Sequence, residues 1–427
     1  MHILIATSRF EDLAGSEITV LEYAIELTQL GHVVSIASLF YSDRFSEDCV
    51  NHQIHLGSVD DPDFISYNWD LIWVFHQPTY HALFAKWNYS AKYVIFSSLS
   101  HFEPLEALPI EVIPINLITT NSVENYEYVK ENYSDYILRT HVLPNSIPSE
   151  FLKNIKCPDI KEKVVIVSNH VPEEILELKN LIIDHGGEVD IIGIGHIETK
   201  VTPELLSNYK FCISIGKTVQ YCLALKIPVY CYDHFGGPGW ITKENINEAA
   251  AKNFSGRCTN RRYKANYIFN NIKDDKIPNE MELEFLKDYA LENFNLKENI
   301  SKSIDLAKNI TFDLPTRSQT EKHILTKNFE IYMRDTVRQK EYKDAYFAES
   351  KLRIKAERTL LELNEKINVE YEKKIKIESE LSKIRTELEK EKLNNKELLQ
   401  QLDFFVKSNI FKKIKIIKSL VAKIKSN

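Results

Sequence analysis

Residues 211–230 decide the fold of the second half of the globular chain and read Phe-Cys-Ile-Ser-Ile-Gly-Lys-Thr-Val-Gln-Tyr-Cys-Leu-Ala-Leu-Lys-Ile-Pro-Val-Tyr. The first five residues form an apolar run that predicts a buried strand, and this run ends at Gly216. A helix is predicted from near Thr218, and a second apolar strand follows Pro228. A strand, a helix and a strand in this order are typical of an α/β domain with a parallel sheet.

The turn between this strand and helix is suited to an anion. Backbone N–H groups at a helix N-terminus point outward and carry partial positive charge. Lys217 adds a full charge and Thr218 a hydroxyl, whereas the P-loop motif would require a glycine where Phe211 stands. We therefore expect a diphosphate site at Gly216, Lys217 and Thr218. The alternative is a Thr218 helix cap beside a solvated Lys217.

Further polar residues follow predicted strands in this half of the chain. Strands are expected at Val164–Val167 and Val189–Ile192, and ligands gather at the carboxyl ends of such strands. The run Gly236-Gly237-Pro238-Gly239 predicts a loop that permits close backbone approach and could close over the donor, and Asp233 just before it is a candidate catalytic carboxylate. Candidate donor-binding residues here are Ser168, Asn169, Tyr232, Gly236, Gly237 and Arg257.

The first half repeats the α/β alternation. Its apolar strands are predicted at residues 3–6, 33–37, 71–75, 93–97 and 117–120. The first helix begins after Ala14-Gly15-Ser16-Glu17, which is not a G-x-G-x-x-G fingerprint, so a dinucleotide site is disfavoured. His76 and His101 follow two of the strands, where a histidine can donate a hydrogen bond or carry a proton. Each is a catalytic candidate, and the alternative for each is a structural role.

Three segments together resemble the GT-B glycosyltransferases, above all the retaining class that includes many bacterial polysaccharide enzymes. They are the strand–turn–helix around Ala14–Glu17, the segment Val142–Pro148, and Pro228-Val229 with the glycine-rich run after it. The resemblance covers about residues 1–312. It implies two Rossmann-like domains that face a cleft, with Gly15 and Ser16 near the donor phosphate and acceptor.

The sequence departs from that family at its donor site. The retaining enzymes carry two glutamates eight positions apart before the Pro-Val pair, and alignment on Pro228 puts Ile213 and Tyr221 there. Ser168-Asn169 stands where the family has arginine and lysine. We expect a glycosyltransferase that uses a nucleotide-diphosphate sugar. The alternatives are a catalytically degenerate scaffold of a polysaccharide-assembly complex and a polyol-phosphate transferase of wall-polymer synthesis.

The C-terminal end has a different composition. The chain has 12 glycines and 14 prolines, but neither residue occurs after Pro315, which predicts long helices. With a at Leu360, ten of the fourteen a and d positions through Phe405 are apolar, as in a coiled coil. Opposite charges at g and e, with Asn395 at a, favour a parallel homodimer; a single solvated helix is the alternative.

The last helix is basic and amphipathic. Residues 407–427 carry seven lysines and no acid, while the 16 basic and 15 acidic residues of 338–406 leave a net charge of −15 for residues 1–337. The acidic body argues against nucleic-acid binding, whereas the basic helix suits an anionic membrane. The expected membrane contacts are Phe411, Lys412, Lys413, Lys415 and Lys418. The alternative is a helix that extends the dimer and has a solvated face.

Together these patterns divide the chain into five parts. They are 1–148 (acceptor-side domain), 149–312 (nucleotide-sugar domain), 313–337 (linking helix), 338–406 (coiled coil) and 407–427 (basic amphipathic helix). No export signal or run of ~18 apolar residues occurs. We expect a cytoplasmic protein, peripheral on the inner face of the cell membrane, with a glycan or lipid-linked acceptor. No cofactor or metal is indicated.

Overall fold

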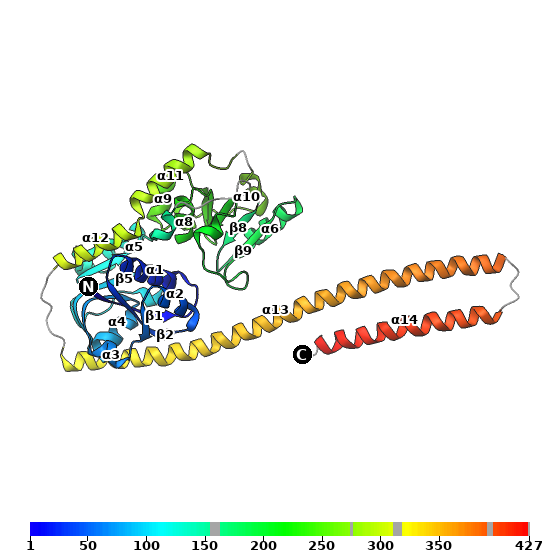
Figure 1. The fold of residues 1–427 in the computed structure, drawn as a ribbon, viewed down its shortest axis with the longest axis horizontal. Helices are drawn as coiled ribbons and strands as arrows, with labels where there is room; N and C mark the ends of the chain where they lie inside the picture. Colours follow the sequence, from blue (N-terminus) through cyan, green and yellow to red (C-terminus); the bar gives the residue numbers. More distant parts are fainter. Residues whose placement is uncertain (154–162, 274–275, 311–317, 391–395, 426–427) are drawn as a thin grey trace. The chain divides into compact units, whose positions relative to one another are not determined.

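The computed structural model describes residues 1–153, 163–273, 276–310, 318–390 and 396–425 of the chain. These form two compact units, Met1–Glu330 and Ile331–Asn427, which are treated separately below. The first unit contains two β-sheets with helices on their faces, and the second is helical (Figure 1).

The first sheet has seven parallel strands in the order β3-β2-β1-β4-β5-β6-β7. The strands are β1 His2–Phe10, β2 Val33–Tyr41, β3 His55–Ser58, β4 Asn68–Phe75, β5 Ser90–Ser98, β6 Leu117–Thr120 and β7 Thr140–Val142. The helices are α1 Gly15–Gln29, α2 Ser46–Asn51, α3 Pro62–Ser66, α4 Gln77–His81 and α5 Val123–Asn132. Both faces of the sheet are covered by apolar clusters, so β1 and β4 are apolar along most of their length.

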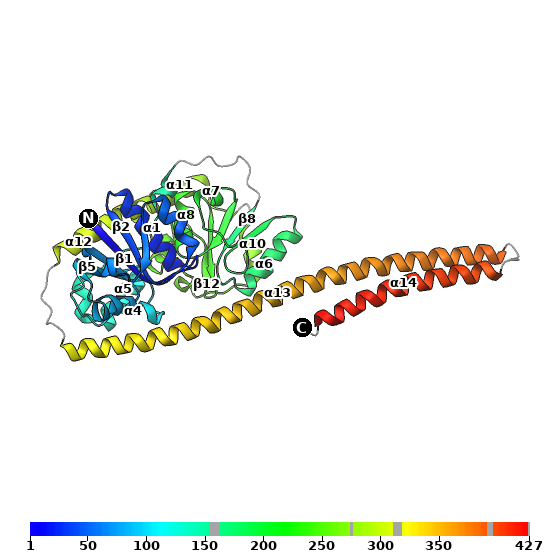
Figure 2. The ribbon, with the colours of Figure 1, turned by 60° about the horizontal axis from the view of Figure 1, so that its bottom comes forward.

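The second sheet has five strands in the order β12-β11-β10-β8-β9, of which only β12 is antiparallel to its neighbour among the described pairs. The strands are β8 Val164–Val167, β9 Val189–Ile192, β10 Phe211–Ser214, β11 Val229–Asp233 and β12 Gly236–Trp240. The helices are α6 Glu173–Asp184, α7 Pro203–Leu206, α8 Lys217–Ala224, α9 Ile246–Ala251, α10 Ala265–Asn271 and α11 Glu280–Asn293. In Figure 2 the strands lie between α8 and α10, whose apolar residues cover opposite faces. The predicted strand–helix–strand of residues 211–230 is confirmed as β10, α8 and β11.

Short turns of other helix types complete the first unit. The 3-10 turns are Asp43–Phe45, Pro104–Glu106, Ser134–Arg139, Ser149–Leu152 and Gly256–Cys258, and a π-helical turn is Ala82–Lys86. Two of these, Pro104–Glu106 and Gly256–Cys258, carry residues of the site described below.

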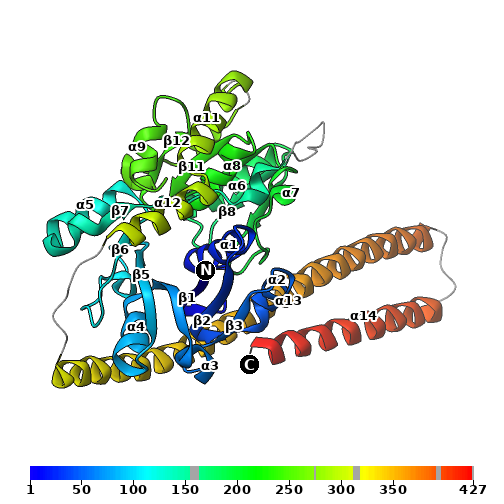
Figure 3. The same cartoon turned by 60° about the vertical axis from the view of Figure 1, so that its left-hand side comes forward.

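The chain crosses between the two domains twice, and the two crossing segments are hydrogen-bonded to each other. The Ile147 N–H donates to the Phe294 carbonyl at 2.6 Å, and the Leu296 N–H donates to the Ile147 carbonyl at 3.1 Å. After this point α12 (Leu296–Asn309) packs on the first sheet, with Ile300 and Ile304 in its core (Figure 3). The sequence-based division at 312 placed this helix with the second domain, whereas its apolar face lies on the first.

The predicted linking helix is the start of α13 (Gln319–Lys390). Its first turns pack on the first domain, where Leu325 and Phe329 are buried and the Phe329 ring lies 6.0 Å from that of Trp87. The helix then continues into the second unit.

The second unit contains the rest of α13 and the helix α14 (Lys396–Lys425). The two helices run antiparallel, and the Lys374 ammonium lies 5.3 Å from the centre of the Phe411 ring (Figures 1–3). The long helices without Gly or Pro are therefore confirmed. The predicted coiled coil of 338–406 lies partly outside the described residues, which include α13 up to Lys390 and α14 from Lys396; Asn395 lies outside them.

Candidate site between the two Rossmann-like domains

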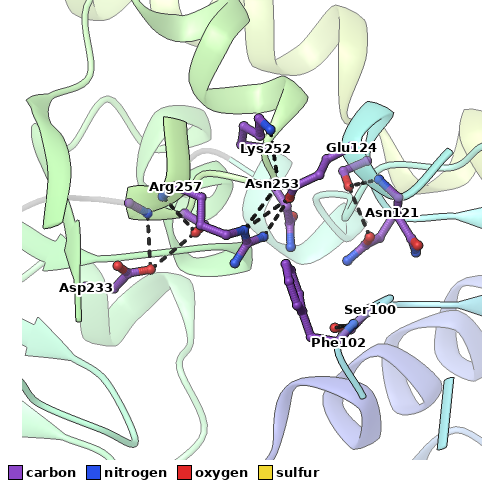
Figure 4. A network of polar contacts seen from close by, with 12 residues as sticks. Ser100, Phe102, Asn121, Glu124, Asp233, Lys252, Asn253 and Arg257 are labelled. Carbon is purple, nitrogen blue, oxygen red and sulfur yellow. Dashed lines mark hydrogen bonds and ion pairs between the residues drawn. The ribbon is translucent and has the colours of Figure 1, made fainter. Parts of the chain in front are cut away.

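Charges from the two domains meet at one cluster of the first unit, which Figure 4 draws from close by. Glu124, in the first turn of α5, accepts from Arg257 Nη2 at 2.8 Å and Nε at 3.2 Å through its Oε2 atom. Its Oε1 atom accepts from Lys252 Nζ at 3.1 Å. Burial opposes ionisation of this carboxyl, but the hydrogen bonds from Arg257 and Lys252 outweigh it and hold the pKa of Glu124 below its ordinary value.

Two aromatic rings flank the Arg257 guanidinium, one from each domain. Its central carbon lies 4.9 Å from the Phe102 ring centre and 5.7 Å from the Phe235 ring centre. Phe102 follows β5, and Phe235 lies in the turn between β11 and β12. Their side chains are 58% and 38% exposed, so apolar ring surface faces solvent beside the cation. Such a surface can stack on a planar base or a sugar ring.

The carboxylate of Asp233 is held by donors of its own domain. It is 5% exposed and accepts from the Phe235 N–H at 2.6 Å and from the Gly256 N–H at 3.1 Å. The Ser255 hydroxyl adds a third bond at 3.3 Å (Figure 4). Asp233 therefore fixes the β11–β12 turn against the segment that carries Arg257, and a catalytic role for its carboxylate stays a prediction.

The glycine-rich run is a strand rather than the loop that its composition suggested. A Cβ on Gly236 would lie 1.9 Å from the Arg261 carbonyl oxygen, and one on Gly237 would lie 2.0 Å from that of Cys231. A Cβ on Gly256 would lie 2.0 Å from the Gly236 oxygen. Glycine is required here because three backbone segments touch directly. A donor contact of Gly236 and Gly237 stays a prediction.

At the start of α8, where a phosphate site was expected, the lysine is paired with a carboxylate of the protein. The Lys217 ammonium forms an ion pair with Glu22 of α1, and the Tyr221 hydroxyl donates to the other oxygen of the same carboxylate. Glu22 is 3% exposed. Lys217 therefore links the two domains in this structure. Burial and then the Glu22 charge raise the pKa of Tyr221, so this hydroxyl keeps its proton.

The side chain of Lys217 is paired, but the backbone at the start of α8 has free space beside it. Gly216 has φ +59°, and its N–H donates to the Phe254 carbonyl at 3.1 Å. The nearest atom to a Cβ built on Gly216 would be 4.0 Å away, in Asn253. Thr218 is half-buried in the first turn. The N–H groups of this turn therefore lie in the same region as Asn253, which neighbours Lys252.

A second carboxylate of α1 fixes the entry to the second domain. Glu26 accepts from the Ser149 hydroxyl at 2.6 Å and from the Ser149 N–H at 3.1 Å. Nearby, the Asn145 amide donates to the Asn253 side chain at 2.9 Å. Glu22, Glu26 and Glu124 were not predicted as site residues. The only sequence signal for the first two is a pair of glutamates one turn apart among the apolar residues of their helix.

His76 is buried at the carboxyl end of β4, where the sequence predicted it. Its Nδ1 accepts from the Ser8 N–H at 3.2 Å, so the proton is assigned to Nε2, which lies 3.3 Å from Oε1 of Glu106. The other Glu106 oxygen accepts from the Leu99 N–H at 2.9 Å. His76 has φ +73°, a conformation that costs a non-glycine residue about 1–3 kcal/mol. The surrounding bonds hold this strained turn in place.

His101 lies at the mouth of a cavity of about 170 Å³ in the first domain. Its ring stacks on Tyr128 with centres 4.7 Å apart. Burial lowers the pKa of His101, and the Glu124 charge partly opposes this shift, so the ring is neutral at pH 7. The cavity lining combines rings and carboxylates and includes His101, Phe102, Tyr128, Tyr133, Glu103 and Glu106. His101 and Glu106, the partner of His76, thus border one cavity.

The remaining candidates lie apart from this cluster. Tyr232 is buried on the α6 side of its sheet, where its hydroxyl donates to Glu174 at 3.0 Å; its contact with a donor stays a prediction. Asn169 accepts from the Ile194 N–H at 3.2 Å, and Ser168 is half-buried beside it. At the start of α1, Gly15 is exposed and Ser16 half-buried. Within the described residues, no three side chains of metal-ligating type come together.

Two Rossmann-like domains, joined at Ile147 and bridged back by α12, form a GT-B fold, as the sequence predicted. No family model matches this sequence, and no curated protein matches it either. Several solved structures are similar to the chain. A glycosyltransferase from Rickettsia africae is 14% identical, with a TM-score of 0.46, over 72% of this chain and 98% of its own.

Two other solved structures are similar over nearly the same region. TarM is 10% identical, with a TM-score of 0.45, over 72% of this chain and 99% of its own. A UDP-N-acetylglucosamine 2-epimerase is 9% identical, with a TM-score of 0.42, over 71% of this chain and 94% of its own. Since one fold hosts many chemistries, the activity of this chain is argued from its own site.

Proposed function

We propose that the chain transfers a sugar from a nucleoside-diphosphate donor to a hydroxyl of a glycan or lipid-linked acceptor. One observation carries the proposal: Arg257 and Lys252 project from the second domain toward the first, beside two exposed aromatic rings. A forked guanidinium and an ammonium match a diphosphate. The N–H groups of the first turn of α8, after Gly216, would supply further donors to the same anion.

The donor would take the place of a carboxylate. Glu124 neutralises Arg257 and Lys252 in the free protein, as an anionic group must where two cations approach each other. In the complex the diphosphate would bind the cations, and Phe102 or Phe235 would stack on the base or sugar. The site would act mainly by orienting the donor and stabilising the diphosphate as it leaves.

The acceptor would enter the cavity beside His101. The bond from the anomeric carbon to the diphosphate oxygen breaks, and the electron pair leaves with the diphosphate. The acceptor oxygen bonds to that carbon and its proton passes to His101, which is neutral for this purpose. Replacement His101→Gln would then slow transfer about 10²–10⁴-fold and leave diphosphate binding intact.

The finer parts of the proposal concern place and partners. The exposed side chains Phe411, Lys412 and Lys415 suit an anionic membrane surface, which would bring a lipid-linked acceptor to the cleft. None of the described helices is long and apolar enough to cross a bilayer. The cytoplasmic membrane face and a homodimer remain part of this proposal.

A scaffold without catalytic activity is the second candidate. It is favoured by Ile213 and Tyr221, which are 1% and 3% exposed and offer no carboxylate where the retaining family has two. The Glu22–Lys217 ion pair also favours a scaffold, because it neutralises the lysine that was expected to bind the donor phosphate.

A thermal-shift panel of UDP, GDP, CDP, TDP and CMP tests these alternatives. The proposal expects stabilisation by at least one nucleoside diphosphate, rising as RT ln(1 + [L]/Kd) with its concentration. Stabilisation by CDP alone would favour a polyol-phosphate transferase. An unchanged melting temperature with all five nucleotides would reject donor binding and leave the scaffold.

A further inference from the structure

The apolar face of α14 is covered by α13. Four apolar residues of α14 are half-buried at helical spacing: Ile410, Ile414, Ile417 and Val421. Among the described residues of α13 from Leu360 to Leu381, those that are half-buried are Leu360, Leu363, Ile367, Glu370, Lys374 and Leu381. All six of these are a or d positions of the predicted coiled coil. A shared groove lined by Val369 and Lys373 of α13 and by Lys413 and Ile417 of α14 places the two stripes together.

Two charged residues within the α13 stripe identify its partner. Lys374 lies over the Phe411 ring at 5.3 Å, and Glu370 lies near Lys413. The Lys373 ammonium, with a smaller contribution from Lys413, holds the pKa of Glu370 below its ordinary value. In a parallel, in-register pair of α13 helices the same positions would face themselves, Glu370 against Glu370 and Lys374 against Lys374. The middle of the stripe therefore matches α14 better than a second α13.

The covered face is also the face that a membrane would require. A basic amphipathic helix binds a bilayer by burying its apolar side chains below the headgroups. The side chains of Ile410, Ile414 and Ile417 cannot contact α13 and the acyl chains at once. Since Phe411, Ile416 and Leu420 stay exposed in the hairpin, a bilayer would bury more apolar surface than α13 does.

We propose that α14 is a reversible membrane anchor. In the free protein α13 covers the isoleucine face of α14, and a bilayer of anionic lipid takes the place of α13. The lysines of α14 then face the headgroups, while Glu370 and Lys374 return to solvent. This inference rests on the membrane contact of the proposed function but is independent of glycosyl transfer.

Locking the hairpin tests the exchange. In the full chain, Glu370→Cys with Lys413→Cys places two thiols in the shared groove, where an oxidant or a short bis-maleimide can join them. The matched control is Glu372→Cys with Asn409→Cys, two exposed positions outside that groove. Binding is measured by co-sedimentation with phosphatidylglycerol–phosphatidylcholine vesicles and with phosphatidylcholine alone.

The joined variant should bind anionic vesicles at least tenfold more weakly than the same protein after reduction, and the control pair should bind equally in both states. Equal binding by the joined and reduced forms would reject the exchange while leaving the membrane contact standing. Failure of the unmodified chain to bind anionic vesicles would reject the membrane contact and this inference with it. The nucleotide panel, run on the same variants, verifies that the globular unit is intact and tests glycosyl transfer separately.

Discussion

The site between the domains and the helical hairpin both use charges at an interface, but they differ in how those charges are paired. At the site, carboxylates of α1 and α5 neutralise Lys217, Lys252 and Arg257, and the pairs join residues 128 to 195 positions apart. In the hairpin, Glu370 and Lys374 interrupt an apolar stripe and are half-buried. The first arrangement depends on the whole fold, whereas the second depends on which helix lies alongside.

Breaking the most deeply buried pair should have the largest effect. Replacement Glu22→Ala leaves Lys217 without its carboxylate and Tyr221 without its acceptor at the contact between α1 and α8. Removal of one partner of a buried pair costs about 3–5 kcal/mol. Urea unfolding should report a loss of this size, and Glu177→Ala, at an exposed position of α6, should stay within about 0.5 kcal/mol. Equal losses in both variants would mean that Glu22 does not hold the domains.

Arg257 separates a role in ligand binding from one in stability. Its replacement by glutamine removes the fork offered to a diphosphate, so transfer should fall about 10²–10³-fold, as when one preorganised donor is lost. The stabilising effect of nucleoside diphosphates in the thermal-shift panel should also disappear. The control is Arg261→Gln, whose exposed side chain lies in the same segment. Undiminished transfer by Arg257→Gln would move the donor site elsewhere.

The GT-B fold could be predicted because it depends on local patterns. Apolar runs, a turn glycine and a helix at residues 211–230 specify β10, α8 and β11 without any knowledge of their neighbours. The pairing of Glu22 with Lys217 could not be predicted, since nothing in either segment identifies the other. The bond between Tyr232 of β11 and Glu174 of α6 could not be predicted for the same reason.

Composition also misled the prediction at β12. Glycine and proline are depleted in strands, so Gly236–Gly239 suggested a mobile loop. The strand forms because Cys231, Gly236 and Arg261 bring their backbones into direct contact, which only glycine permits. In the arm, the 3-4 periodicity identified the stripe on α13, but periodicity alone does not distinguish a second copy from α14.

The pH dependence of stability tests whether the charge of Glu124, like that of Glu22, holds the two domains together. Arg257 and Lys252 lower its pKa in the folded protein despite burial. The stability it adds is therefore complete above its unfolded pKa of about 4.3 and is lost as pH falls through the lower folded value. Replacement Glu124→Gln should cost about 1–2 kcal/mol at pH 7, and the difference from the unmodified protein should shrink below pH ~4.3. A difference that stays constant to pH 3 would exclude a charge effect.

The smallest effect expected is in the hairpin, where the charges are only partly buried and the sign of the change is more informative than its size. Glu370→Lys puts two lysines together in the groove with Lys413, so the melting temperature of the arm, followed by circular dichroism, should fall slightly. The double variant Glu370→Lys with Lys413→Glu restores opposite charges and should recover it. In a parallel dimer, Glu370→Lys would replace one self-facing pair of like charges by another, and the second change would have nothing to restore. Recovery in the double variant therefore assigns the α13 stripe to α14, and its absence assigns the stripe to a second copy of the chain.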